Sequence, residues 1–104
     1  MTADHLTVIL AQRVMGWGVG PDRFSTGNGG WKSRWRFQPN CNLEDAFLLL
    51  EKAAPEEYSM RGDGGGNFEA CVQIGGRRGK ACGVQKARTI TFAIARALGI
   101  EVEP

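Results

Sequence analysis

Apolar residues recur every three or four positions in three segments of the chain, the spacing that places them on one face of a helix. The first segment is followed by Gly16, the second begins at a capping residue, Asn42, and stops before Pro55, and the third closes with Gly99. These residue types favour helix ends at those positions. The pattern therefore predicts helices over residues 3–15, 42–54 and 85–98.

Between residues 31 and 37 the pattern changes to strict alternation, which is typical of a half-buried strand. The odd positions carry aromatic or small side chains, and the even positions are all basic. This alternation predicts a strand that buries Trp35 and Phe37 and exposes a basic row. The preceding residues 17–30 show no periodicity and hold six Gly or Pro residues, so they are predicted to form a long loop.

Three more strands are predicted in the second half of the chain, where apolar and polar residues alternate and glycine-rich turns separate the segments. They cover residues 57–61, 67–74 and 80–84. The resulting order is α-β-α-β-β-β-α, without the βαβ units that build a parallel sheet. We therefore expect an α+β fold in which three helices pack on one sheet of about four mostly antiparallel strands. The length of 104 residues fits a single domain, 1–104.

Composition excludes several classes of protein. The chain is 42% hydrophobic and 23% charged, as in an ordinary globular domain. Because no apolar run could span a membrane and the N-terminus does not resemble a secretion signal, we expect a cytoplasmic protein without a membrane partner. The three cysteines lack zinc-site spacing, and the single histidine, His5, lies near the N-terminus. We therefore expect no catalytic residues, no metal and no cofactor, and hence no enzyme.

Three stretches together resemble one protein family. They are Val14–Trp17, where the first helix ends, Trp35–Pro39 at a strand-to-helix corner, and the alanine-rich final helix Ala87–Ile100. In this order they are similar to the phage alpha-beta-alpha sandwich domain family, small proteins encoded in phages and prophages. The resemblance covers nearly the whole chain and implies a phage or prophage origin and a sheet flanked by helices. It implies no agreed activity and brings no catalytic residues with it.

Charge is unevenly distributed, although the net charge is only +2. Residues 75–97 contain six basic residues and no acid, whereas residues 43–57 contain five acids and one lysine. Such a chain can present a focused positive site. Arg77, Arg78 and Lys80 follow glycines whose backbone amides can approach a phosphate closely, so they are candidate ligand-binding residues. The alternative interpretation is a solvated hairpin tip that charge keeps soluble.

A second group of candidate ligand-binding residues lies in the predicted strand: Trp31, Arg34 and Arg36. Indole and guanidinium planes stack on bases, and guanidinium groups also hold phosphates. We hypothesise that this group and the 75–80 turn converge on one concave site that binds a phosphate-bearing small molecule, such as a nucleotide, without catalysis. Two alternatives stay open: a nucleic-acid-binding module, and a protein-interaction or virion accessory module. The sequence is also compatible with a homo-oligomer.

Overall fold

Two three-stranded antiparallel sheets and three α-helices form the part of the chain that the computed structural model describes, residues 3–27 and 29–102. The first sheet contains β1 (Gly18–Val19), β2 (Arg23–Gly27) and β3 (Gly30–Ser33). The second contains β4 (Glu57–Gly62), β5 (Phe68–Ile74) and β6 (Arg77–Gly83). The helices are α1 (Ala3–Arg13), α2 (Leu43–Ala53) and α3 (Lys86–Ala97), and a 3₁₀ turn, η1 (Arg34–Arg36), follows β3.

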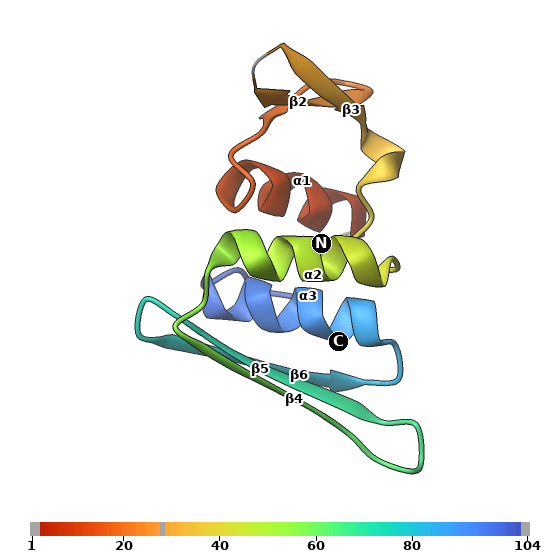
Figure 1. Ribbon diagram of the computed structural model, residues 1–104, viewed down its shortest axis with the longest axis vertical. Helices are drawn as coiled ribbons and strands as arrows, with labels where there is room; N and C mark the ends of the chain where they lie inside the picture. Colours follow the sequence, from red (N-terminus) through yellow and green to blue (C-terminus); the bar gives the residue numbers. More distant parts are fainter. Residues whose placement is uncertain (1–2, 28, 103–104) are drawn as a thin grey trace.

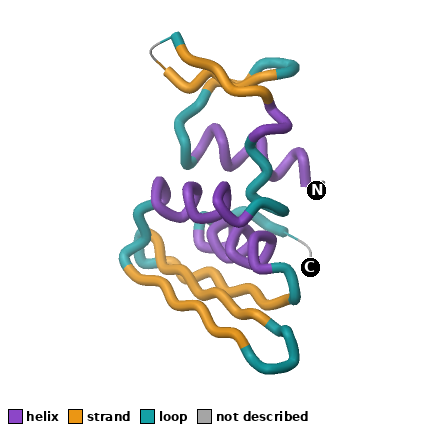
Figure 2. Tube along the Cα trace, turned by 45° about the vertical axis from the view of Figure 1, so that its right-hand side comes forward, coloured by secondary structure: helices purple, strands orange, loops and turns teal. Residues whose placement is uncertain are grey.

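The elements are stacked along the longest dimension of the molecule, which measures 43 Å. The β4–β5–β6 sheet lies at one end, and α3, α2 and α1 follow it in that order (Figure 1). The β1–β2–β3 sheet forms the opposite end, and Figure 2 shows the same order from a second direction. One face of the β4–β5–β6 sheet carries α3, and no described helix covers its other face (Figure 1).

The central element of the core is α3, which packs against β5 and β6 on one side and α2 on the other. Its apolar stripe includes Ile90 and Ile94, neither of which is exposed to solvent. Strand β5 contributes Ala70 and Val72 to this layer, and α2 contributes Leu49, all of them equally shielded. Burial of these apolar side chains is the main force that holds the helices on the sheet.

The predicted helices are confirmed to within two residues at each end, and α2 shows why. The side chain of Asn42 accepts a hydrogen bond from the Asp45 N–H at 3.1 Å, which caps the start of the helix. Ala54 ends it in the left-handed conformation, with φ 47°, directly before Pro55. None of the described helices has the length and apolar character needed to cross a membrane.

A cluster of three aromatic rings connects the β1–β2–β3 sheet to the segments beside it. Trp17 follows α1, Phe24 lies in β2, and Phe37 follows η1. The ring centroid of Trp17 is 5.6 Å from that of Phe24 and 5.0 Å from that of Phe37. Neither phenylalanine is exposed, so the prediction that Phe37 belongs to the core is confirmed.

The predicted fold class is wrong in its sheet. Instead of one sheet of about four strands, the described residues form six strands in two separate sheets, in the order α-β-β-β-α-β-β-β-α. The additional strands come from residues 17–30, predicted as a loop. Here β1 has only two residues, too few to show alternation, and Gly27 and Gly29, with φ of 92° and 76°, lie at the turn between β2 and β3.

The strand predicted over residues 31–37 also differs from the observed structure, because β3 ends at Ser33. The next three residues form η1, and a 3₁₀ helix has a period of three rather than two. Trp35 is therefore turned away from the core and is 67% exposed, so the prediction that it is buried is wrong. In the second sheet, β6 begins at Arg77, three residues before the predicted start.

Candidate anion-binding groove

The residues predicted to bind a ligand lie in two separate sheets. The first group is Trp31, Arg34 and Arg36, and the second is Arg77, Arg78 and Lys80. The first group belongs to β3 and η1 at one end of the molecule, and the second belongs to β6 at the other end (Figure 1). The three described α-helices lie between them in both ribbon and tube views. The structure therefore does not bring the two groups together.

Within β6, the basic side chains are divided between the two faces of the sheet, because successive residues of a strand alternate. Arg77 lies on the face that α3 covers. On the other face, Arg78 donates a hydrogen bond from Nη2 to Oε1 of Gln73 at 3.3 Å. Lys80 Nζ lies there too, 3.6 Å from Oε1 of Glu69. These side chains do not share one cavity at the turn.

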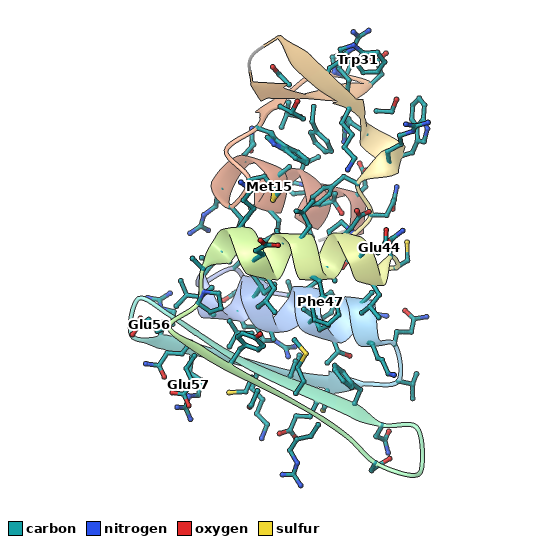
Figure 3. The ribbon with its side chains drawn as sticks, viewed as in Figure 1. Met15, Trp31, Glu44, Phe47, Glu56 and Glu57 are labelled. Atoms are coloured by element: carbon teal, nitrogen blue, oxygen red, sulfur yellow. The ribbon has the colours of Figure 1, made fainter. Side chains whose placement is uncertain are left out.

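The β5–β6 turn, Gly75–Gly76, already contacts a carboxylate. The N–H of Gly76 donates a hydrogen bond to Oε1 of Glu56 at 2.7 Å, and Figure 3 shows Glu56 beside this turn. A carboxylate at this amide repels an incoming phosphate and occupies a donor that the phosphate would need. The geometry favours the alternative interpretation of this segment, a charged hairpin tip.

Arg34 has a structural role in the first group. Its Nη2 lies 3.0 Å from Oδ2 of Asp4 in α1. Its Nη1 donates to the backbone carbonyls of Gly20, at 3.4 Å, and Pro21, at 3.3 Å. These contacts connect α1, the β1–β2 turn and η1 through one guanidinium. Arg36, by contrast, is exposed to solvent.

Basic side chains do gather in a groove between β6 and α3. Its volume is about 630 Å³, within the range of small-molecule sites. The groove is lined by residues 80–85 and, from α3, by Arg88, Thr89, Phe92 and Arg96. Three of the described lining residues are basic and none is acidic. Of the residues predicted from the sequence, only Lys80 borders this groove.

Arg88, Phe92 and Arg96 follow one another at four-residue intervals, so their side chains share one face of α3. The guanidinium carbon of Arg88 lies 4.8 Å from the centroid of the Phe92 ring, and that of Arg96 lies 5.9 Å from it. Arg96 also donates from Nη1 to the backbone carbonyl of Lys80 at 2.8 Å. This hydrogen bond fixes Arg96 across the groove, whereas Arg88 is exposed.

The chemistry of this lining suits recognition. A guanidinium group matches the geometry of a phosphate or carboxylate, and one stacked on an aromatic ring presents a flat cationic surface. The described lining residues include no histidine and no carboxylate, the usual groups of acid–base catalysis. Among the residues that the structure describes, no three His, Cys, Asp or Glu side chains are grouped so as to hold a metal ion.

Three groove residues, Arg88, Phe92 and Arg96, are absent from the site predicted from the sequence. A signal for them was present, because the two arginines belong to the acid-free basic stretch 75–97 and flank an aromatic residue at helical spacing. The glycine-rich turn 75–80 has more basic residues per length of chain than the final helix, so the site was predicted at the turn. What could not be predicted was that the open edge of β6 lies beside this face of α3.

Comparison with known proteins identifies the fold. No known protein family matches the chain, and no curated protein sequence is similar to it. A crystal structure described as a phage protein from Bacillus cereus ATCC 14579 superposes with a TM-score of 0.78. It shares 14% sequence identity, and the match covers 99% of this chain and 93% of that one. The chain therefore has the fold of a phage protein. The sheet flanked by helices that the resemblance implies is not observed, because α3 covers one face of the β4–β5–β6 sheet and no described helix covers the other.

Proposed function

We propose that this is a small, non-catalytic binding protein of phage or prophage origin that holds a nucleotide-like anion in the groove between α3 and β6. The observation that carries the proposal is the arrangement of Arg88 and Arg96 around Phe92, in a groove whose described lining contains no acid. The ligand is a phosphate-bearing molecule with an aromatic ring. The structural match to a phage protein supports the origin.

The charges in the groove favour an anion. Arg88 and Arg96 extend from α3 and supply the positive charge of the groove. Lys80 borders the groove with its backbone carbonyl, which accepts the hydrogen bond from Arg96, whereas its side chain lies on the other face of the sheet beside Glu69. Hydrogen bonds from guanidinium groups to phosphate are among the strongest polar contacts that proteins make.

The flat surfaces in the groove favour a nucleotide over inorganic phosphate. The Phe92 ring is partly exposed, and the Arg88 guanidinium that stacks on it extends the surface available to a base. Stacking of a base on aromatic and guanidinium planes adds affinity without selecting one base. We therefore expect nucleotides to bind more tightly than pyrophosphate, with little discrimination between purines and pyrimidines.

The test is a thermal-shift and calorimetric titration with mono-, di- and triphosphates of adenosine and uridine, a cyclic dinucleotide, and pyrophosphate. A ligand that binds the folded protein should raise Tm by about 10 °C or more when present at about 100 times its Kd. Arg88→Gln should abolish this rise for every ligand. Phe92→Leu should weaken the binding of nucleotides and leave the affinity for pyrophosphate unchanged. If none of these compounds changes Tm, the proposal is wrong.

Arg61→Gln provides the matched control. Arg61 is an exposed arginine in β4, at the opposite edge of the same sheet, and does not line the groove. Its substitution removes the same charge and should leave every nucleotide affinity unchanged. Equal losses of nucleotide affinity in Arg88→Gln and Arg61→Gln would mean that binding depends on net charge alone. That result would contradict a specific site in the groove.

A second candidate function, binding an acidic peptide, is favoured by the open edge of β6. This strand ends the sheet, and alternate residues of an antiparallel edge strand direct their backbone groups away from the neighbouring strand. The bond from Arg96 to the Lys80 carbonyl shows that this edge faces the groove. An extended peptide of alternating Glu and Val could pair there by strand addition. Tighter binding of this peptide than of any nucleotide would select the second candidate.

A further inference from the structure

The outer face of the β1–β2–β3 sheet carries polar residues and an exposed tryptophan, whereas its inner face carries a buried phenylalanine. Strand pairing places Arg23 opposite Ser33 and Ser25 opposite Trp31, so these four side chains share one face. Phe24 lies on the other face and is fully buried. The outer face therefore carries two serines, one tryptophan and one arginine at these positions.

Two tryptophans are exposed at this end of the molecule. Trp31 is 61% exposed and is placed by Figure 3 at the tip of the molecule, and Trp35 in η1 is 67% exposed. Because they are four positions apart in the chain, their Cα atoms are at most about 14 Å from each other. Large apolar side chains rarely remain this exposed in a cluster unless they contact a partner.

Two arginines lie beside the tryptophans. Of the four basic residues in 18–36, Lys32 contacts the inner Trp17 and Phe37 rings and Arg34 pairs with Asp4, which leaves Arg23 and Arg36. The guanidinium carbon of Arg23 lies 4.9 Å from the centroid of the Trp31 ring, and Arg36 is exposed beside Trp35 in the chain. Asp22 contacts Nε of Arg23 at 3.3 Å, but this pair is solvent-exposed on both sides and therefore weak.

We propose that this surface, defined by Arg23, Trp31, Trp35 and Arg36, binds single-stranded nucleic acid. The two indoles serve as stacking platforms for bases, and the two arginines contact the phosphates. Exposed aromatic rings combined with cationic side chains on an open surface are the features that sequence-tolerant single-strand binding requires. The surface is separate from the α3–β6 groove, and α1 and α2 lie between the two (Figures 1 and 2).

The exposure of the surface favours an extended partner. All four of its residues are exposed to solvent, so a polymer can reach each of them. A polymer that places several bases and phosphates along an open face gains contacts with each successive nucleotide. The positive charge gives affinity for a polyanion and opposes association of two copies through this face.

The test uses fluorescence anisotropy of a labelled twelve-nucleotide oligo(dT) and of the equivalent oligo(U), at low and intermediate salt. We expect the wild-type protein to bind both, with quenching of tryptophan emission. Trp31→Leu should weaken binding about 10-fold, the effect of losing one stacked base. Arg23→Gln should lower the slope of log affinity against log salt by about 0.7, the value for one lost phosphate contact on a single strand.

Matched controls separate this surface from the rest of the molecule. Tyr58→Leu removes an exposed aromatic side chain of β4, in the other sheet, and should leave oligonucleotide affinity unchanged. Arg61→Gln removes an exposed charge of the same β4 strand and should also leave it unchanged. Trp31→Leu should keep the Tm rise with mononucleotides, so that failure of the groove proposal and failure of this one can be told apart. Absence of binding at low salt, equal losses in Trp31→Leu and Tyr58→Leu, or binding to anionic vesicles without binding to either oligonucleotide would overturn the proposal.

Discussion

Gly79 in β6 lies directly against the backbone of Ala93 in α3, with no space between them for a side chain. A methyl group at position 79 would overlap the carbonyl oxygen of Ala93 and the backbone nitrogen of Ala97. Both helix residues are small and buried. The close approach of α3 to the sheet therefore depends on one residue without a Cβ atom, and the same two elements, β6 and α3, line the groove.

Gly79→Ala should destabilise the protein strongly for this reason. The added methyl group meets backbone atoms, which cannot move aside as a flexible side chain can, so the helix must shift away from the sheet. We expect a loss of about 3 kcal/mol in the free energy of unfolding, at the upper end of overpacking costs. Urea denaturation monitored by circular dichroism measures it.

Gly64→Ala is the matched control for this change. Gly64 lies in the β4–β5 turn, and nothing lies within 4 Å of the position that its Cβ atom would occupy. Its backbone is not in the left-handed region. The substitution should therefore be neutral or stabilise by up to about 1 kcal/mol, because it restricts the unfolded chain. Equal midpoints for the two variants would contradict the close-packing argument.

Thr91→Val tests a buried polar contact between α3 and the corner before α2. The Thr91 hydroxyl donates a hydrogen bond to the carbonyl of Pro39 at 2.7 Å, and Thr91 is completely buried. Valine keeps the shape but leaves this carbonyl without its donor, so we expect a loss of about 1–3 kcal/mol in unfolding free energy. Chemical denaturation is the measurement.

Thr89→Val is the comparison for that variant. The Thr89 hydroxyl also bonds a carbonyl, that of Gln85, but the backbone N–H of Thr89 donates to the same oxygen at 3.0 Å. The carbonyl therefore keeps a partner, and the cost should stay below about 1 kcal/mol. An equal or larger loss for Thr89→Val than for Thr91→Val would show that the unpaired carbonyl does not set the cost.

Arg34→Ala should loosen the β1–β2 turn more than it lowers global stability. The variant loses the ion pair with Asp4 and the hydrogen bonds to the Gly20 and Pro21 carbonyls. We expect faster amide hydrogen exchange in residues 18–22 and a global loss of about 1 kcal/mol. Asp4→Ala removes only the exposed ion pair and should cost about 0.5 kcal/mol. If Asp4→Ala accelerates exchange as much as Arg34→Ala does, the hydrogen bonds from Arg34 to the Gly20 and Pro21 carbonyls do not hold the turn.

Much of the fold could be predicted because its longer elements carry apolar residues at a regular spacing and bury them on one face. The helices and the β4–β5–β6 hairpins show clear periods of 3.6 and two, so their order and approximate bounds follow from the sequence. The β1–β2–β3 sheet could not be predicted in this way. Its strands have two to five residues, and glycine at several positions removes the side chains that would reveal alternation.

The candidate site was harder to predict than the fold, because it depends on contacts between distant segments. The alternating pattern of residues 31–37 continues through η1, so the sequence gives no sign that the chain turns and exposes Trp35. Likewise, nothing local shows that Glu56 binds the amide of Gly76, twenty residues away. The division of Arg77 and Arg78 between two faces follows from strand alternation only once β6 is known to begin at Arg77 instead of residue 80.

Asp63 should titrate below the ordinary range of an aspartate because it organises the β4–β5 turn. Its Oδ1 accepts hydrogen bonds from the N–H groups of Asn67, at 3.0 Å, and Gly65, at 2.8 Å, and these donors lower the pKa of the carboxyl. Because the pKa is lower in the folded state, the ionised form stabilises the turn fully above the unfolded pKa, and this contribution disappears as pH falls through the folded pKa. Carbon-13 NMR titration of the Asp63 carboxyl should give a midpoint below that of the urea-unfolded chain, and the Gly65 amide should shift with the same midpoint. In Asp63→Asn the Gly65 amide should lose this acid titration. A folded midpoint at or above the unfolded one would show that these hydrogen bonds do not favour the carboxylate.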